Sequence, residues 1–140
     1  MTNPAEAPTP TRIVFGTDGW RARIAEDFTF DNVRRCADGV AAYVADRGEQ
    51  ARGVVVAYDR RFASEHFAAA AAEVLLAHDI PVAYAVHAVP TQMSSYEVVE
   101  RGSAAGIVIT ATQPIAVLRG SGQDLSLIEG LIDRCSTPEG

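Results

Sequence analysis

The chain has 140 residues, of which 48% are hydrophobic and 21% are charged, a balance that suits one globular domain and argues against disordered and fibrous classes. The formal net charge is -6, and all 12 basic residues are arginines, scattered without a cationic stripe, which argues against a nucleic-acid partner. No segment reaches the ~18 apolar residues that a membrane span needs, so we expect no membrane partner either.

The N-terminal residues 1–11 are rich in Pro and Ala and lack the charged start and apolar run of a signal peptide. We expect them to form a flexible tail, followed by a single domain over residues 12–140. Cys36 and Cys135 are far apart and lack C-x-x-C spacing, so each is expected to be a buried free thiol rather than a disulfide partner or metal ligand. These features together predict a cytoplasmic protein.

Patterns typical of strands and helices alternate along the first half of the chain. Residues 12–15 form a short β-prone run, followed by Gly-Thr-Asp-Gly at residues 16–19, whose Asp-Gly pair favours a tight turn. Thr29 is expected to cap an amphipathic helix that continues to Gly48. Residues 53–58 are continuously apolar, as in a strand that is buried on both faces of a parallel sheet.

The alternation continues in the second half. Ser64 is expected to cap a second helix, and residues 81–86 are expected to form the next strand. A short helix is predicted from Pro90 and Thr91 to Arg101. The following buried strand is predicted at residues 104–110, and Leu and Ile at helical spacing indicate a last helix at residues 124–135.

This order predicts βαβ crossovers and therefore a three-layer α/β/α domain with a mainly parallel, mixed sheet of about four strands. In such sheets ligands bind beyond the carboxyl ends of the strands. Four loops are therefore expected on one rim, at residues 16–21, 59–61, 87–91 and 110–114.

Three of these loops resemble domain I of the α-D-phosphohexomutases, the phosphoglucomutase and phosphomannomutase family. The matching stretches follow the family's order: Phe-Gly-Thr-Asp-Gly-Trp-Arg-Ala at residues 15–22, Tyr-Asp-Arg-Arg-Phe-Ala-Ser at 58–64 and Gly-Ile-Val-Ile-Thr-Ala at 106–111. The resemblance implies phosphoryl transfer between a serine and hexose phosphates, supported by Mg²⁺. It places Thr112 at the phosphoserine position and assigns Arg21, with Thr17 and Gly19, to phosphate binding.

The phosphate-carrying loop departs from the family pattern. Thr112-Gln113-Pro114 stands where the family has Ser-His-Asn-Pro, and the chain contains no Lys. The β-methyl group of threonine restricts χ1 and crowds an in-line attack. Family members also carry further domains with the metal loop, the sugar-recognition loop and the distal phosphate site, for which 140 residues leave no room.

We therefore expect part of a hexose-phosphate enzyme that is inactive on its own, binds no metal tightly and has the missing C-terminal domains as partners. The alternatives are a non-catalytic α/β binding module derived from that family, or a decayed gene product. A flavodoxin-like or receiver-like domain shares the alternation, but this chain lacks an acidic pocket after the first strand. Two groups of side chains are given structural rather than catalytic roles: Asp59, Arg60 and Arg61 in pinning a turn, and His66, His78 and His87 at the surface or in packing.

Overall fold

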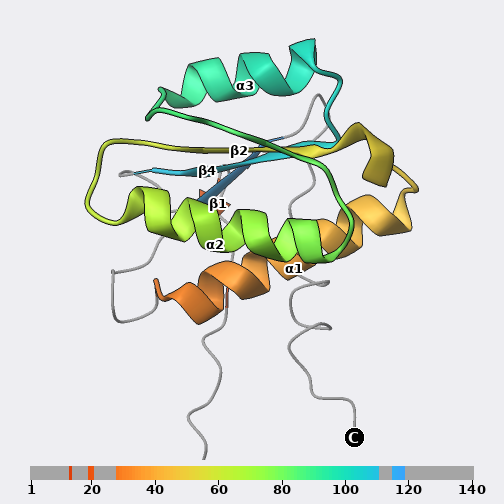
Figure 1. Cartoon of the computed structure of the whole chain (residues 1–140), viewed down its shortest axis with the longest axis horizontal. Coiled ribbons are helices and arrows are strands. Elements are labelled where there is room, and N and C mark those ends of the chain that lie inside the picture. Colours follow the sequence, from red (N-terminus) through yellow and green to blue (C-terminus); the bar gives the residue numbers. More distant parts are fainter. Residues whose placement is uncertain (1–12, 14–18, 21–27, 111–114, 119–140) are drawn as a thin grey trace, which may run out of the picture.

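The computed structural model of the chain describes residues 13, 19–20, 28–110 and 115–118. Within these ranges a five-stranded sheet has the order β1-β5-β4-β2-β3. Helix α3 lies on one face of this sheet, and α1 and α2 lie on the other (Figure 1). The elements are β1 Gly19–Trp20, α1 Phe30–Asp46, the 3-10 turn η1 Gln50–Arg52, β2 Val54–Tyr58, α2 Ser64–Ala77, β3 Val82–Tyr84, α3 Thr91–Glu100, β4 Ala105–Ile109 and β5 Ile115–Leu118. The predicted three-layer α/β/α fold is confirmed.

The sheet is mixed. Strand β2 pairs in parallel with β3 and β4, whereas β5 is antiparallel to both β4 and β1. Strand β1 therefore runs in the same direction as β4. The sequence had predicted about four strands and had not assigned one to residues 115–118. A four-residue apolar run is too short to be recognised by its pattern, and β5 is identified by its pairing with β4.

The first long helix begins as predicted. The Thr29 side chain accepts a hydrogen bond from the backbone N–H of Asn32, at 3.2 Å, and this satisfies one of the free donors of the first turn of α1. For the second helix, the prediction that Ser64 is the N-cap is wrong. Its N-cap is Ala63, in the left-handed region with φ 64°, and Ser64 is already the first helical residue.

Two further predictions differ from the structure. Strand β3 is shorter than the predicted residues 81–86 because it is an edge strand, paired only with β2 among the described residues, and Val86 beyond it is 80% exposed. Ile13, the described residue of the predicted strand at residues 12–15, is buried but has no strand conformation. The other residues of that predicted strand lie outside the described residues, and strand β1 lies within and just after the predicted turn. The predicted tail and last helix lie outside the described residues.

Strands β2 and β4 are buried at every position, as their apolar runs predicted. Their side chains alternate between two packing environments. Val56 and Ile107 belong to the large core beneath α1 and α2, together with Phe28, Phe67 and Leu75. Ala57 and Val108 form a separate small cluster on the α3 side. No helix in the described part of the chain is long and apolar enough to cross a membrane.

Gly53 determines how β2 begins. Its φ is +73°, and a Cβ atom at this position would lie 2.8 Å from the Pro81 carbonyl oxygen. That same oxygen accepts a hydrogen bond from the Val54 N–H at 2.9 Å. Glycine therefore permits both the turn and the close approach that sets the β2 and β3 register.

Candidate functional site

The carboxyl ends of the parallel strands meet at one edge of the sheet. The Asp59 N–H, just after β2, donates to the Ile109 carbonyl oxygen at the end of β4, at 3.0 Å. The Val89 N–H donates to the Tyr58 carbonyl oxygen, also at 3.0 Å. The structure therefore brings the loop at residues 59–61, the loop at residues 87–91 and the beginning of the loop at residues 110–114 to one rim, as predicted.

The short strand β1 reaches the same rim. Trp20 is the register partner of Ile115, and Gly19 that of Ala116. Ile115 follows the predicted phosphate-carrying loop directly in the chain. Of the four residues assigned to phosphate chemistry, Gly19 is placed by this pairing, and Thr17, Arg21 and Thr112 lie outside the described residues, so their roles remain predictions.

Asp59 holds the turn between β2 and α2. Its Oδ1 atom accepts hydrogen bonds from the Arg61 N–H at 3.0 Å and from the Ser64 hydroxyl at 2.9 Å. The structural role predicted for Asp59 is thus confirmed. The serine hydroxyl predicted to cap α2 is used in this bond, and the N-cap residue Ala63 has no polar side chain to replace it.

A cleft of about 500 Å³ opens at the rim. Its lining consists mainly of polar and charged side chains: Tyr58, Asp59, Arg60, Arg61, Glu65 and His87, with Val86 and Ala88. The Tyr58 hydroxyl donates to the Val86 carbonyl oxygen at 3.3 Å, which fixes one wall to the segment after β3. Charged and hydrogen-bonding groups of this kind suit a polar ligand rather than an apolar one.

Tyr84 ties the edge strand to the start of α2. Its hydroxyl donates to the Glu65 carbonyl oxygen at 3.1 Å, and its ring lies 5.8 Å from that of Tyr58. Burial, with smaller contributions from Tyr58 and the Glu65 carboxylate, raises the pKa of Tyr84 above its ordinary value. Tyr84 therefore remains a neutral hydrogen-bond donor at neutral pH.

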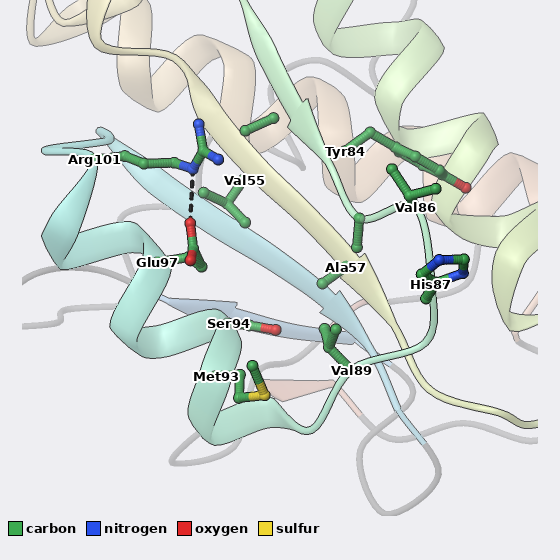
Figure 2. A pocket seen from close by; sticks show the side chains of 12 residues that line it. Val55, Ala57, Tyr84, Val86, His87, Val89, Met93, Ser94, Glu97 and Arg101 are labelled. Atoms are coloured by element: carbon green, nitrogen blue, oxygen red, sulfur yellow. Dashed lines mark hydrogen bonds and ion pairs between the residues drawn. The ribbon is translucent and has the colours of Figure 1, made fainter.

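A second hollow of about 290 Å³ lies between α3 and the β2 and β3 strands (Figure 2). Its floor consists of small apolar side chains, among them Val55 and Ala57. The Glu97 carboxylate and the Arg101 guanidinium at one end pair with each other at 2.8 Å. Glu97 and Arg101 are the charged residues of its lining, and their pairing leaves no free charged group for phosphate chemistry among the described residues of this groove.

The three histidines and Cys36 lie in surroundings that suit structural roles. His66, His78 and His87 are exposed, as predicted, and the His78 Nε2 atom lies 3.0 Å from an Asp38 carboxylate oxygen. Cys36 is a buried free thiol, and its burial raises its pKa far above the ordinary value, so it is inert at neutral pH. Within the described ranges, no three His, Cys, Asp or Glu side chains gather as they would around a metal ion.

Sequence reasoning did not single out Glu65, Val86 or Ala88 as cleft residues. Glu65 was recognisable in principle, because the first turn of α2 starts beside the rim. Val86 and Ala88 were not, because their place in the cleft depends on the early end of β3.

The fold and its rim define the molecule as an α/β/α domain of the kind that binds ligands beyond the carboxyl ends of parallel strands. The family model for the phosphoglucomutase/phosphomannomutase α/β/α domain I matches residues 12–114. The chain therefore belongs to the phosphoglucomutase and phosphomannomutase family and corresponds to its domain I.

Individual relatives agree with this assignment. A Schizosaccharomyces pombe protein assigned as a phosphoribomutase is 35% identical over 114 residues, covering 78% of this chain and 19% of the relative. The glucose 1,6-bisphosphate synthase of Mus musculus is 36% identical over 112 residues, covering 72% of this chain and 18% of the relative. The chain spans about a fifth of the length of these curated relatives.

A solved structure shows the same fold. The crystal structure of a Thermus thermophilus protein assigned as a phosphomannomutase superposes with a TM-score of 0.78 and 30% sequence identity. The match covers 89% of this chain and 30% of that chain.

Proposed function

We propose that this chain is the domain of a phosphohexomutase that presents the phosphoacceptor loop, with Thr112 at the acceptor position and Arg21 as a phosphate contact. One observation supports this above all. Trp20 and Ile115 are register partners, and they are the chain neighbours of Arg21 and of the loop at residues 111–114. Because β5 is antiparallel to β4, both ends of that loop start from the same edge of the sheet.

Phosphoryl transfer depends on an acceptor held in line and on cations that neutralise the charge of the moving group. In this proposal Thr112 supplies the hydroxyl, Arg21 supplies one cation, and Thr17 and Gly19 lie beside it. The threonine methyl group hinders the attack, so transfer to this loop is slow. The proposed substrates are hexose phosphates. Because the relatives are named for different sugar phosphates, the proposed substrate class includes other phosphorylated sugars.

The chain by itself is proposed to have no mutase turnover. The described residues do not supply a set of ligands for a divalent cation, and so Mg²⁺ would be held by other parts of a complete family enzyme. The cytoplasm is the compartment in which phosphorylated sugars and a free buried thiol such as Cys36 are both expected.

Intact mass measurement after incubation with glucose 1,6-bisphosphate and Mg²⁺ tests the acceptor role. We expect at most a small fraction of chains to gain one phosphoryl group, and none in Thr112→Val. Thr112→Ser should increase the fraction only slightly, because the neighbouring Gln113 and the shortened loop remain. A full-length phosphomannomutase provides the positive control.

Two outcomes would contradict parts of the proposal. Labelling that persists in Thr112→Val would show that the acceptor is another residue. Mutase turnover by the purified chain, proportional to its concentration and free of contaminating enzyme, would show that the domain needs no others. The altered sequence of residues 112–114 supports the second candidate, a module that binds phosphorylated ligands without transferring the group. Ligand binding without any mass gain would favour that candidate.

A further inference from the structure

Two arginines of the rim cleft differ from every other arginine that the structure describes. The side chains of the other five pair with nearby groups: Arg34 with Asp31 at 3.1 Å, Arg35 with Asn32 at 2.9 Å, Arg47 and Arg52 with Glu49 at 3.5 and 3.3 Å, and Arg101 with Glu97 at 2.8 Å. The guanidinium groups of Arg60 and Arg61 have no hydrogen bond or ion pair with any described residue. They are adjacent in the chain and line the same cleft.

A shortage of acidic groups does not explain this. The chain has 18 acidic and 12 basic residues, and two carboxylates line the cleft itself. The Asp59 Oδ1 atom is already bonded to the Arg61 N–H and the Ser64 hydroxyl. The Glu65 carboxylate lies 3.8 Å from the His66 Nε2 atom. The Asp59 carboxylate thus holds the turn, and neither carboxylate pairs with the guanidinium group of Arg60 or Arg61.

We propose that Arg60 and Arg61 form a phosphate-binding site in the rim cleft, separate from the contact predicted at Arg21, which takes the phosphate group of a phosphorylated sugar. Guanidinium groups present planar pairs of N–H donors that match two oxygens of a phosphate. The Asp59 N–H bond to the Ile109 carbonyl places this cleft beside the start of the loop at residues 110–114. The choice of a sugar phosphate rests on the proposed function. The observation that the two guanidinium groups pair with no described residue is independent of it.

The charges of the cleft determine how strong this site is. Arg60 and Arg61 are offset by Asp59 and Glu65, so with His87 neutral the formal charge of the cleft is zero. A phosphate is therefore held by directed hydrogen bonds from the two guanidinium groups rather than by a net positive field. We expect millimolar affinity that falls as salt is added, because exposed charges are screened. His87 and Glu65 offer hydrogen-bonding groups to sugar hydroxyls.

An NMR titration of the ¹⁵N-labelled 140-residue chain tests the site. The probes are inorganic phosphate and glucose 1,6-bisphosphate, and glucose is the control without a phosphate group. Both phosphates should shift the amide signals of residues 58–65 and 86–88, and glucose should not. The double variant Arg60→Gln/Arg61→Gln should weaken binding about tenfold or more, the size expected when two charged hydrogen-bond donors are removed.

The matched control is Arg34→Gln/Arg47→Gln, which removes the same charge from exposed ion pairs on or next to α1. It should change the affinity by less than about twofold, because it alters only long-range, screened electrostatics. Arg21→Gln should leave binding at the cleft in place. The Arg61 N–H that donates to the Asp59 carboxylate belongs to the backbone, so this bond survives the substitution and the turn should stay folded, as circular dichroism would show.

Three results would overturn the site. Equal weakening in both double variants would show non-specific charge attraction. Rim signals that do not respond to either phosphate would show that the cleft binds none. Shifts that are abolished by Arg21→Gln and retained in Arg60→Gln/Arg61→Gln would place the ligand at Arg21. That result would support the proposed function and rule out the site at Arg60 and Arg61. If the double variant unfolds, the single variants Arg60→Gln and Arg61→Gln apply the same criteria. The mass measurement on Thr112 can fail without affecting this titration.

Discussion

The two faces of the sheet are packed in different ways. The face beneath α1 and α2 holds large buried side chains, including Phe28, Phe67 and Leu75, in one continuous core. The face beneath α3 holds a small cluster centred on Ala57 and Val108, and a groove of about 290 Å³ separates part of the helix from the strands.

The outer surface of α3 strengthens the contrast. Met93 is 57% exposed, and Tyr96 and Val99 are each 63% exposed. The alternating side chains of β2 and β4 are equally buried on both faces, so the sequence of these strands gives no sign of this difference. The comparison teaches that continuous burial of a parallel strand does not imply equal packing on its two sides. The α1/α2 face should therefore provide most of the stability.

Phe67→Ala should have the largest effect. The Phe67 ring is 4% exposed and lies 4.6 Å from the rings of both Phe28 and Phe30, so the substitution leaves a cavity in the main core. We expect a loss of about 3–5 kcal/mol in the free energy of unfolding, measured by urea denaturation. Phe62→Ala is the control, because that ring is 87% exposed, and it should change stability by less than about 0.5 kcal/mol. Comparable losses in the two variants would contradict the packing described.

The same substitution on the two faces gives a direct comparison. Val56 and Val108 are both completely buried in central strands, and they point into the two different clusters. Val56→Ala should cost about 2–3 kcal/mol, because the enclosed core cannot collapse around the cavity. Val108→Ala should cost about 1–2 kcal/mol, since the looser α3 side can relax. Urea unfolding of both variants measures the difference, and a larger loss for Val108→Ala would reverse our ranking of the faces.

Cys36 makes the α1/α2 face sensitive to high pH. Burial raises the pKa of this thiol above its ordinary value of 9.0, so above that pH the unfolded chain releases a proton that the folded chain retains. The contribution of Cys36 to stability is therefore complete below about pH 9 and declines by about 1.4 kcal/mol per pH unit above it. Unfolding curves of the chain and of Cys36→Ala at several pH values should differ in slope by this amount. Parallel curves would show that the thiol is not buried in this way, and Cys135→Ser serves as the control for the second cysteine.

Met93→Ala should have the smallest effect. The side chain lies at the edge of the α3 groove and is 57% exposed, so its loss should change stability by less than about 0.5 kcal/mol. Leu75→Ala, fully buried on the opposite face, should cost about 2–5 kcal/mol under the same conditions. Thermal unfolding of the pair gives the comparison, and a large loss for Met93→Ala would mean that α3 contributes to stability more than its exposure indicates.

The position of the rim could be predicted from the sequence, whereas the roles predicted for Thr17, Arg21 and Thr112 lie outside the described residues. The assignment of the loops to one rim followed from the order of strands and helices, because parallel strands end on the same edge. The role of Asp59 followed from its position directly after a buried strand. It could not be predicted that the guanidinium groups of Arg60 and Arg61 pair with no described residue, because Asp59 and Glu65 lie close enough in the chain to pair with them. Only the hydrogen bonds of the folded turn show where the Asp59 carboxylate is used.

The sequence by itself determined the three described helices, the central strands and the family, since each depends on local patterns: the Thr29 cap, the apolar runs of β2 and β4, and the Phe-Gly-Thr-Asp-Gly-Trp-Arg stretch. The tertiary structure alone decided that residues 115–118 form a strand, that β3 ends at Tyr84, and that Ala63 rather than Ser64 caps α2. The physical reason in each case is a contact that forms only in the folded chain. A strand of three or four residues is stabilised by the neighbour with which it pairs, and the hydroxyl of Ser64 bonds to a carboxylate that the fold brings to it.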